Sequence, residues 1–491
     1  MQLSTRKVLD RSFTALGALA VVLMVGSLLV LIVPIAIRGS GAFVFRETVE
    51  HRRFLLDTFG RGDRSKIEAE VVATAQAREP LYQMLAGFRR QLLLIEDDGL
   101  LALPVRARVE AKLRASMTEK LPAGSSLDEA AVAGKLPTEI RKFLKSQGEG
   151  LSERLVKLFG PPPTQKGQAA LPRDRYGDTR WDRAEVTLQG ILLEEMWDYS
   201  DPTRLAEATY QPRIDIFRGT ALEPLFGHLE QHAEEMLAPR WTFYWGFLTD
   251  PPVDSNLFGG IWPAVVGTFY LALGAMIFAV PAGVITAIYL VEYARSGSRL
   301  VSVLRIFIST LAGVPSIVFG LFGLAFFINQ LHVSASRSVL AGSLTLATLV
   351  LPTVIRASEE ALRAVPHAYK EAALSLGASR WRTILTVILP AAMPGVLTGV
   401  ILSLGRAAGE TAPIIFTAAV SVGAVVGLGD VLSEPTQALP WSIYNVATEN
   451  RWADEIRHVQ YGMVLVLLAL VLLLNAAAIM LRARISRKLR G

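Results

Sequence analysis

The sequence predicts an all-α polytopic membrane protein with six transmembrane helices and a large, mainly helical insert between helices 1 and 2. Of the 491 residues, 51% are hydrophobic, and the mean hydropathy of +0.38 is high for a soluble protein. The charges are concentrated, because residues 41–240 hold 29 of the 50 Lys and Arg and 31 of the 44 Asp and Glu. A charge-rich block within an apolar chain is typical of a soluble domain between membrane spans.

We therefore expect four segments along the chain. Residues 1–37 hold the N-terminus and the first span, and residues 38–255 form the insert. Residues 256–481 form the membrane domain with a loop at 357–390, and residues 482–491 form a basic tail. Outside residues 41–240 there are 21 basic and 13 acidic residues, a surplus that indicates topology signals and contact with the lipid bilayer, with no nucleic-acid role.

Six apolar segments are long enough to cross a bilayer, which takes roughly 20 residues. The first has no charge over 25 positions, so we interpret it as a retained anchor; the alternative, a signal peptide, usually has an apolar region of about 7–15 residues. The fifth is longer than one straight span, and Pro394 and Pro413 are expected to break it. The predicted spans are residues 13–37, 261–291, 306–328, 339–355, 390–426 and 461–481.

Basic residues beside the spans predict that both termini lie in the cytoplasm. Arg6, Lys7 and Arg11 precede the first span, and the tail after the last span carries five basic residues without an acidic partner. The loops after the second and fourth spans are basic as well. The insert then lies on the opposite, periplasmic side, which its own charges do not prevent because long domains translocate largely regardless of charge.

Within the insert the patterns predict mostly helix, and they assign the domain no known fold or role. Helices are expected at residues 68–94 and 127–158, followed by a break at Pro161-Pro162-Pro163. Short strands are expected at residues 191–199 and 213–217.

The loop at 357–390 carries the most specific motif, Glu371-Ala372-Ala373, then Gly377 after three residues, then Val387-Ile388-Leu389-Pro390 after nine. Residues 359–376 favour a helix apart from Pro366, and Gly377 is expected to end it as a left-handed cap. A second helix, at residues 379–389, returns to the membrane. Two short helices joined at a glycine make a rigid knob that fits a groove of a partner; the alternative is an ordinary amphipathic loop.

This motif resembles the EAA signature of ABC importer permeases, with Val387 where the signature has Ile. The resemblance implies that Glu371, Ala372, Ala373 and Gly377 belong to a coupling loop that contacts a separate ATPase.

The sequence shows no phosphate-binding loop for a nucleotide: Gly134-Lys135 lacks the upstream Gly and the following Ser or Thr of that motif. We therefore expect a transport subunit that is not an enzyme, with ATP hydrolysed by a partner.

Arg406 and Glu410 lie inside the predicted fifth span, four residues apart, and so on one helix face. Charges within a span cost roughly 2.5–3.5 kcal/mol each on insertion scales, so they normally face a partner or a watery path. The planar guanidinium of an arginine can donate two parallel hydrogen bonds to an oxyanion. The alternative is an ion pair that only fixes this span to a neighbour. Small residues at 395, 399, 405 and 409 favour close helix packing.

The segment Gly405-Arg406-Ala407-Ala408-Gly409-Glu410-Thr411-Ala412-Pro413 resembles phosphate-specific ABC transporter permeases of the PstA type. The segments at residues 259–264, 288–293, 311–320 and 351–356 support the resemblance, which covers about residues 255–481. It implies a subunit of a phosphate importer in the bacterial inner membrane. Its partners would be a PstC-type second permease, two copies of a cytoplasmic ATPase, a periplasmic phosphate-binding protein and the lipid bilayer. It also implies that Arg406 lies on the phosphate path; the role of Glu410 is inferred from spacing alone.

Two other functions stay open at this point. A permease for another oxyanion, sulfate or molybdate, would share the coupling loop. A membrane-anchored periplasmic sensor would need no such loop and would carry a cytoplasmic output domain. We predict no cofactor and no metal site, because His228 and His232 are four residues apart without an evident third ligand. The chain contains no cysteine, which excludes disulfides and thiol chemistry.

Overall fold

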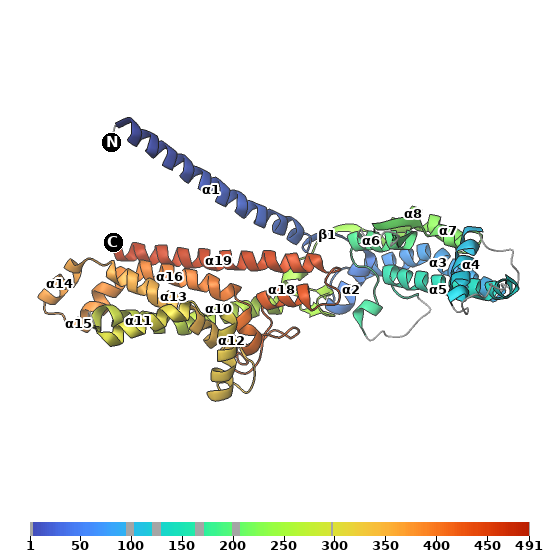
Figure 1. The fold of residues 1–491 in the computed structure, drawn as a ribbon. Coiled ribbons are helices and arrows are strands. Elements are labelled where there is room, and N and C mark those ends of the chain that lie inside the picture. Colours follow the sequence, from blue (N-terminus) through green and yellow to red (C-terminus); the bar gives the residue numbers. More distant parts are fainter. Residues whose placement is uncertain are drawn as a thin grey trace. The chain divides into compact units, whose positions relative to one another are not determined.

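The computed structural model describes residues 3–94, 103–119, 129–162, 171–198, 207–295 and 298–490. The chain divides into two compact units (Figure 1): one holds the residues up to Phe43 and from Tyr244 onward, and the other is Val44–Phe243. Strands among the described residues form three two-stranded antiparallel sheets, and helices make up most of the rest. The prediction of a mainly helical membrane protein is therefore confirmed.

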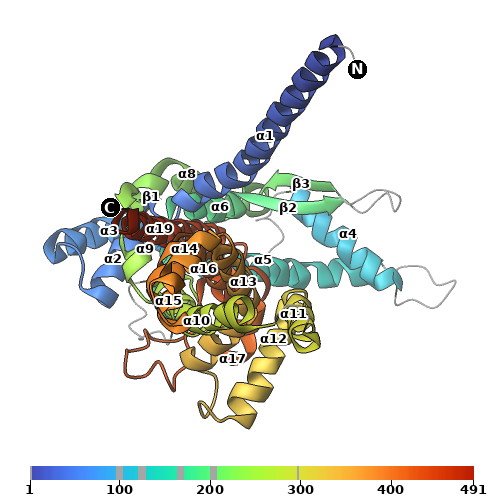
Figure 2. The ribbon, with the colours of Figure 1, turned by 90° about the vertical axis from the view of Figure 1, so that its left-hand side faces the viewer.

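The first unit is built on four long helices that pack in sequence order, α10 (Trp262–Ile288), α13 (Val339–Arg363), α16 (Leu389–Gly409) and α19 (Arg457–Arg490). They run side by side in Figure 1 and are seen nearly end-on in Figure 2. Their contacts are close because small residues meet there. A Cβ on Gly399 would lie 2.3 Å from Cβ of Ala357, and one on Gly395 would lie 2.6 Å from Cβ of Ala361.

The remaining elements complete this unit; the first of them is a long helix, and three of the others are π-helical turns. They are α1 (Leu3–Ser40), α9 (Gly246–Thr249), β5 (Pro252–Val253), β6 (Phe258–Gly259), η2 (Tyr289–Tyr293), α11 (Arg299–Ala312), α12 (Ser316–Gly323), η3 (Leu324–Gln330), α14 (His367–Ser375), α15 (Arg380–Thr383), η4 (Ile384–Ile388), α17 (Ala412–Thr417) and α18 (Leu439–Thr448).

Five helical segments among the described residues are long and apolar enough to cross a membrane: Ser12–Ser40, Trp262–Tyr293, Val339–Arg363, Arg380–Gly409 and Arg457–Arg487. The expected third span is instead a bent pair, in which α11 and the segment Ser316–Gln330 meet at 104°. The bend has a local cause: Pro315 has no amide hydrogen and disfavours a helical conformation at Val314. Figure 2 shows α12 leaving the bundle across the direction of α11. The count of six spans therefore stays a prediction.

The expected fifth span, 390–426, is too long. Helix α16 ends at Gly409, and Glu410 has an extended backbone (φ −79°, ψ 129°). Pro394 does not break the helix as predicted: it lies inside α16, and the helical segment Arg380–Gly409 continues through it. Pro413 falls in the first turn of the short helix α17, after the break. The fourth span is longer than expected, since α13 continues to Arg363.

The first and last strands of the second unit, β1 (Val44–Glu47) and β4 (Arg240–Phe243), pair antiparallel with each other. Between them lie elements listed here in chain order: α2 (Val49–Phe59), α3 (Arg64–Leu94), α4 (Leu103–Glu119), α5 (Glu129–Phe159), η1 (Pro172–Asp174), α6 (Trp181–Leu192), β2 (Leu193–Asp198), β3 (Glu207–Pro212), α7 (Ile214–Phe217) and α8 (Glu223–Leu237). Their apolar faces, chiefly those of α3, α5 and α8, form one core.

The two expected long helices of this unit are present as α3 and α5, although residues 127–128 lie outside the described residues. Helix α5 ends before Pro161; Pro163 is also outside the described part. One expected strand is present as β2, with Tyr199 not described. The other prediction was wrong, since residues 214–217 form α7 and the partner of β2 is residues 207–212. A four-residue apolar run does not distinguish a strand from a buried helical turn.

Candidate functional site

The loop at 357–390 folds into the predicted knob of two short helices joined at Gly377. The helix expected at 359–376 is however interrupted: residues 359–363 end α13 and α14 begins only at His367, because Pro366 has no amide hydrogen and disfavours a helical conformation at Val365. Helix α14 ends in a left-handed residue, Gly377 (φ +80°). The Gly377 amide donates to the Leu374 carbonyl (2.9 Å), and the Ala378 amide donates to the Ala373 carbonyl (3.1 Å), the two bonds of a Schellman cap. Ser379 then caps the next helix, since its hydroxyl accepts from the Arg382 amide. The glycine of the motif is therefore explained by backbone conformation.

The end of the motif anchors the knob. Ile384 and Ile388 of the π-helical turn η4 are buried and pack with Ala287 and Ile288 of α10 and with Leu362 of α13. The segment then continues into α16, so the knob and this membrane helix are joined without a loop. The apolar half of the motif thus serves as a hydrophobic anchor.

Two polar contacts fix the knob to the end of α10. Lys370 of α14 donates to the carboxylate of Glu292 in η2, whose side chain is only 6% exposed. The guanidinium of Arg380 lies over the ring of Tyr293, with its Cζ atom 5.4 Å from the ring centroid. Sequence reasoning missed Glu292; the available signal was a lone carboxylate at the end of an otherwise apolar span.

The outer surface of the knob is apolar and uncovered. Tyr369, Leu374, Leu376 and Trp381 are 54%, 42%, 89% and 57% exposed. Glu371 and Ala372 are exposed as well, whereas Ala373 is half-buried. Large apolar side chains clustered at a surface and rimmed by polar ones mark protein contact sites.

Arg406 and Glu410 are brought together at the other end of α16. Arg406 lies in its last turn, and Glu410 is the first residue after it. Arg406 Nε and Glu410 Oε1 are 3.3 Å apart, and the side chains are 40% and 21% exposed. A cation in the last turn is favoured by the helix dipole. With 1.5 Å of rise per residue, the 21 residues of α16 place this pair about 30 Å from the knob.

Other polar groups of α16 and α19 lie close to the last turns of α16. A Cβ on Gly405 would lie 3.4 Å from Nδ2 of Asn475 in α19, an ordinary contact distance. Asn475 Oδ1 and Ser403 Oγ are buried without a hydrogen-bond partner among the described residues. Sequence reasoning missed Asn475, a lone amide in a Val/Leu/Ala run. Gly409 was expected to pack against a helix, but a Cβ there would meet nothing within 4 Å.

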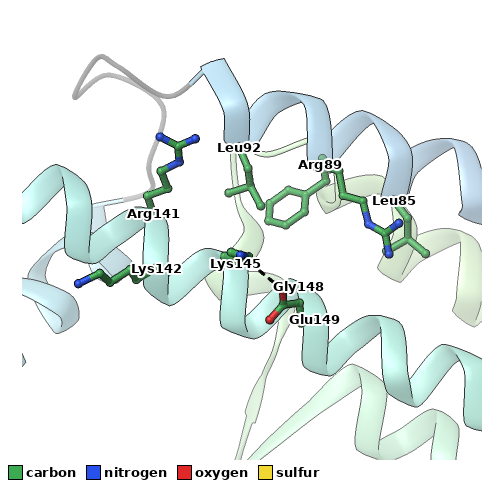
Figure 3. A pocket seen from close by; sticks show the side chains of 9 residues that line it. Leu85, Arg89, Leu92, Arg141, Lys142, Lys145, Gly148 and Glu149 are labelled. Atoms are coloured by element: carbon green, nitrogen blue, oxygen red, sulfur yellow. Dashed lines mark ion pairs between the residues drawn. The ribbon is translucent and has the colours of Figure 1, made fainter.

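The unit Val44–Phe243 has a cavity of its own, of about 470 Å³, between α3 and α5. Figure 3 shows Leu85, Arg89 and Leu92 of α3 and Arg141 and Lys142 of α5 among the side chains that line it. The ion pair drawn there joins Lys145 and Glu149 at 3.9 Å. His228 and His232 stack in α8, with ring centroids 4.4 Å apart, and no group of three metal-ligating side chains occurs in the described parts of the chain.

Comparison with known proteins gives the following similarities. The family described as "binding-protein-dependent transport system inner membrane component" matches residues 279–491. The phosphate transport system permease protein PstA 1 of Mycobacterium tuberculosis is 40% identical over 233 residues, 47% of this chain and 72% of that protein. The PstA protein of Yersinia pestis is 37% identical over 232 residues, 47% of this chain and 74% of that protein. A solved chain of the MetNI methionine ABC transporter, inward-facing, covers 46% of this chain and 94% of its own length at 19% identity, with a TM-score of 0.35.

Proposed function

The chain belongs to the PstA family of phosphate transport system permeases, and from this premise we propose that Arg406 and Glu410 form part of its phosphate path. It is a permease subunit of a phosphate ABC importer and a multi-pass membrane protein. The observation that carries the proposal is an ion pair at the end of a membrane helix: Arg406 Nε and Glu410 Oε1 are 3.3 Å apart, and both side chains are still partly exposed.

The chemistry of the pair suits hydrogen phosphate. Five N–H donors on a rigid guanidinium allow Arg406 to bind two phosphate oxygens while keeping its contact with Glu410. The carboxylate of Glu410 accepts hydrogen bonds only, so it favours an anion that carries a proton and repels one that does not. Hydrogen phosphate carries such a proton at neutral pH and sulfate does not, which gives this pair a physical means of selecting phosphate.

The exposure of the pair supports a path shared with a second subunit. Arg406 is 40% exposed on the surface of this chain. A charge at membrane depth needs a partner or water around it. A second permease of the PstC type would enclose the pair and complete the path.

The knob would couple this path to ATP hydrolysis. Its exposed apolar side chains, together with Glu371, Ala372, Ala373 and Gly377 of the motif, would fit a groove on one copy of an ATPase dimer. Because η4 and α16 continue directly from the knob, a displacement of the knob would move the helix that carries Arg406. Such a rigid connection is what alternating access requires. ATP would be hydrolysed by that partner, since we assign this chain no nucleotide site.

The topology proposed for this subunit has both termini in the cytoplasm of a bacterial cell and the bent pair α11–η3 as one of six spans. The insert, residues 38–255, would then face the periplasm, where the phosphate-binding protein delivers its ligand. Because the chain has no cysteine, single cysteines can report the topology. An impermeant maleimide should label Val186→Cys in intact cells and Leu376→Cys only after permeabilisation; the reverse pattern would contradict this topology.

Radiolabelled phosphate uptake tests the function itself. Cells that lack their own phosphate importers should take up phosphate when this chain is produced with its partner subunits, and a tenfold excess of sulfate or molybdate should not compete. Equal competition by sulfate would favour a permease for another oxyanion. A Glu410→Gln variant that admits sulfate, with phosphate uptake retained, would assign the selectivity to this carboxylate.

A further inference from the structure

A second cation-rich region lies at the base of the knob, away from the Arg406–Glu410 pair. A cavity of about 580 Å³ opens between the segment after η2, the start of α11, the end of α13 and the start of α14. Its walls are mainly polar, with four side chains that are cationic at neutral pH, Arg295, Arg305, Arg363 and Lys370, and with His367 beside them. We name this the basic cavity.

The carboxylates around the basic cavity do not balance its cations. Glu292 is paired with Lys370. Oε1 of Glu359 accepts from both Arg305 (3.0 Å) and Arg363 (2.8 Å), so one carboxylate faces two guanidiniums. In the part of the chain that the structure describes, no carboxylate pairs with Arg295. An excess of two positive charges therefore surrounds the cavity.

The two guanidiniums keep unused donors. Arg305 and Arg363 are 45% and 54% exposed, and each uses one of its five N–H groups on Glu359. They also line a smaller cavity of about 310 Å³, together with Arg356, Glu359 and Glu360. Planar forks of this kind match the oxygens of a phosphate group better than a single ammonium does. The first turns of α11 and α14 border the basic cavity at Ser298 and His367 and add to its positive potential.

We propose that the basic cavity binds a phosphate group, carried either by inorganic phosphate or by the headgroup of an anionic phospholipid. A bound phosphate group would join Arg305 of α11 and Arg363 of α13 to Lys370 and His367 of α14. Since α14 is half of the knob, occupancy would fix the position of the knob and so control its contact with the ATPase. The site would report either the phosphate already inside the cell or the anionic lipid beside the transporter; this consequence rests on the proposed topology.

The absence of native cysteine allows a direct test in the assembled transporter. Ser302 lines the basic cavity, so the labelling rate of Ser302→Cys by a maleimide reports its occupancy. The full chain with its partner subunits is placed in phosphatidylcholine nanodiscs and labelled with and without millimolar inorganic phosphate, at constant ionic strength set with chloride. A second arm uses nanodiscs that contain phosphatidylglycerol, without phosphate. Ser375→Cys, on the knob but outside the cavity, serves as the control reporter.

We expect labelling of Ser302→Cys to slow at least threefold in one arm, which identifies the source of the phosphate group, while Ser375→Cys is unchanged. Half-protection should need about tenfold more ligand in Arg295→Gln and in Arg363→Gln, because each removes a charged donor. Arg484→Gln, an exposed arginine of α19 outside the cavity, should keep the protection. An unchanged labelling rate in both arms, or protection that persists equally in both cavity variants, would overturn the proposal. Arg295 has no ion pair to lose within the described residues, so its variant separates ligand binding from misfolding.

Discussion

Lys370 in the knob donates a hydrogen bond to Glu292 at the end of α10, and the carboxylate is almost fully buried. A buried carboxylate that loses its only cationic partner is destabilised strongly, by about 3–5 kcal/mol. We therefore expect Lys370→Met to release the knob from α10. Reconstituted transporters should lose most phosphate-stimulated ATP hydrolysis and uptake, while the amount of chain in the membrane stays within about twofold of the wild type.

A double variant separates the effect of leaving a buried charge unpaired from the effect of losing the contact between Lys370 and Glu292. Glu292→Leu with Lys370→Met leaves no unpaired charge and should recover part of the activity, since replacing both partners of a buried pair by apolar residues is often neutral. A double variant as inactive as Lys370→Met would mean that the ion pair has a role beyond holding the knob.

Gly377 gives a second prediction, because its conformation is left-handed while its surroundings are open. A Cβ there would meet no atom within 4 Å, so the main penalty on Gly377→Val comes from the backbone, roughly 1–2 kcal/mol. We expect weaker co-purification of the ATPase with this variant. Gly377→Asn should bind it almost as the wild type does, because Asn tolerates this conformation. Equal loss in the two variants would contradict a purely conformational role.

The packing of α13 against α16 gives a third prediction. The Cβ of Gly399→Ala would lie 2.3 Å from that of Ala357, so the two helices must separate. Overpacking a core costs roughly 1–3 kcal/mol of stability. We therefore expect the apparent Tm of the purified chain in detergent to be several degrees lower. Adding Ala357→Gly should restore it. Gly26→Ala on α1, with nothing within 4 Å, is the matched control.

These features differ in how far the sequence predicted them. Much of the knob was predictable, because Gly377, Ser379 and the Val387–Pro390 end of the motif each act through local backbone or apolar burial; the interruption of its first helix at Pro366 was not predicted. The pairing of Arg406 with Glu410 was also predictable from a spacing of four. Glu292 and Asn475 were not, since their importance depends on which helices lie beside them.

The errors have similar causes. The bend at Pro315 and the end of α16 at Gly409 were missed because hydropathy records apolar composition and not backbone direction. Residues 412–426 are apolar enough to continue a span, but only residues 412–417 form a helix there. The short helix α7 was mistaken for a strand, since its apolar residues are too few to show a period.

The Val44–Phe243 unit gives a fourth prediction, centred on Arg78. This guanidinium is 8% exposed, pairs with Glu50 at 2.8 Å, and donates to the carbonyls of Met236 and Phe159. It therefore joins α3 to α2, α8 and the end of α5. We expect Arg78→Met to lower the free energy of unfolding of this unit by about 3 kcal/mol, the lower end for a broken buried pair, because Glu50 would lose its closer cationic partner and keep only Arg53 at 3.5 Å.

Urea unfolding of the full chain measures this effect through the reactivity of Ala233→Cys, a buried position in α8. The matched control is Arg64→Met, whose pair with Glu68 is exposed on both sides and should contribute only about 0.3–0.5 kcal/mol. A similar loss in the two variants would show that the Arg78 network does not hold the unit together.

The most direct test of the phosphate path is radiolabelled phosphate uptake, at low external phosphate, by cells that carry Arg406→Gln, Arg406→Lys or the wild-type chain with its partner subunits. We predict that Arg406→Gln abolishes uptake while the chain reaches the membrane and still binds the ATPase. Arg406→Lys should retain only a small fraction, because an ammonium cannot form the bidentate contact. Glu371→Ala, on the knob, should also lose uptake but with weakened ATPase binding. Wild-type uptake in Arg406→Gln would contradict the account and leave this arginine as a packing residue.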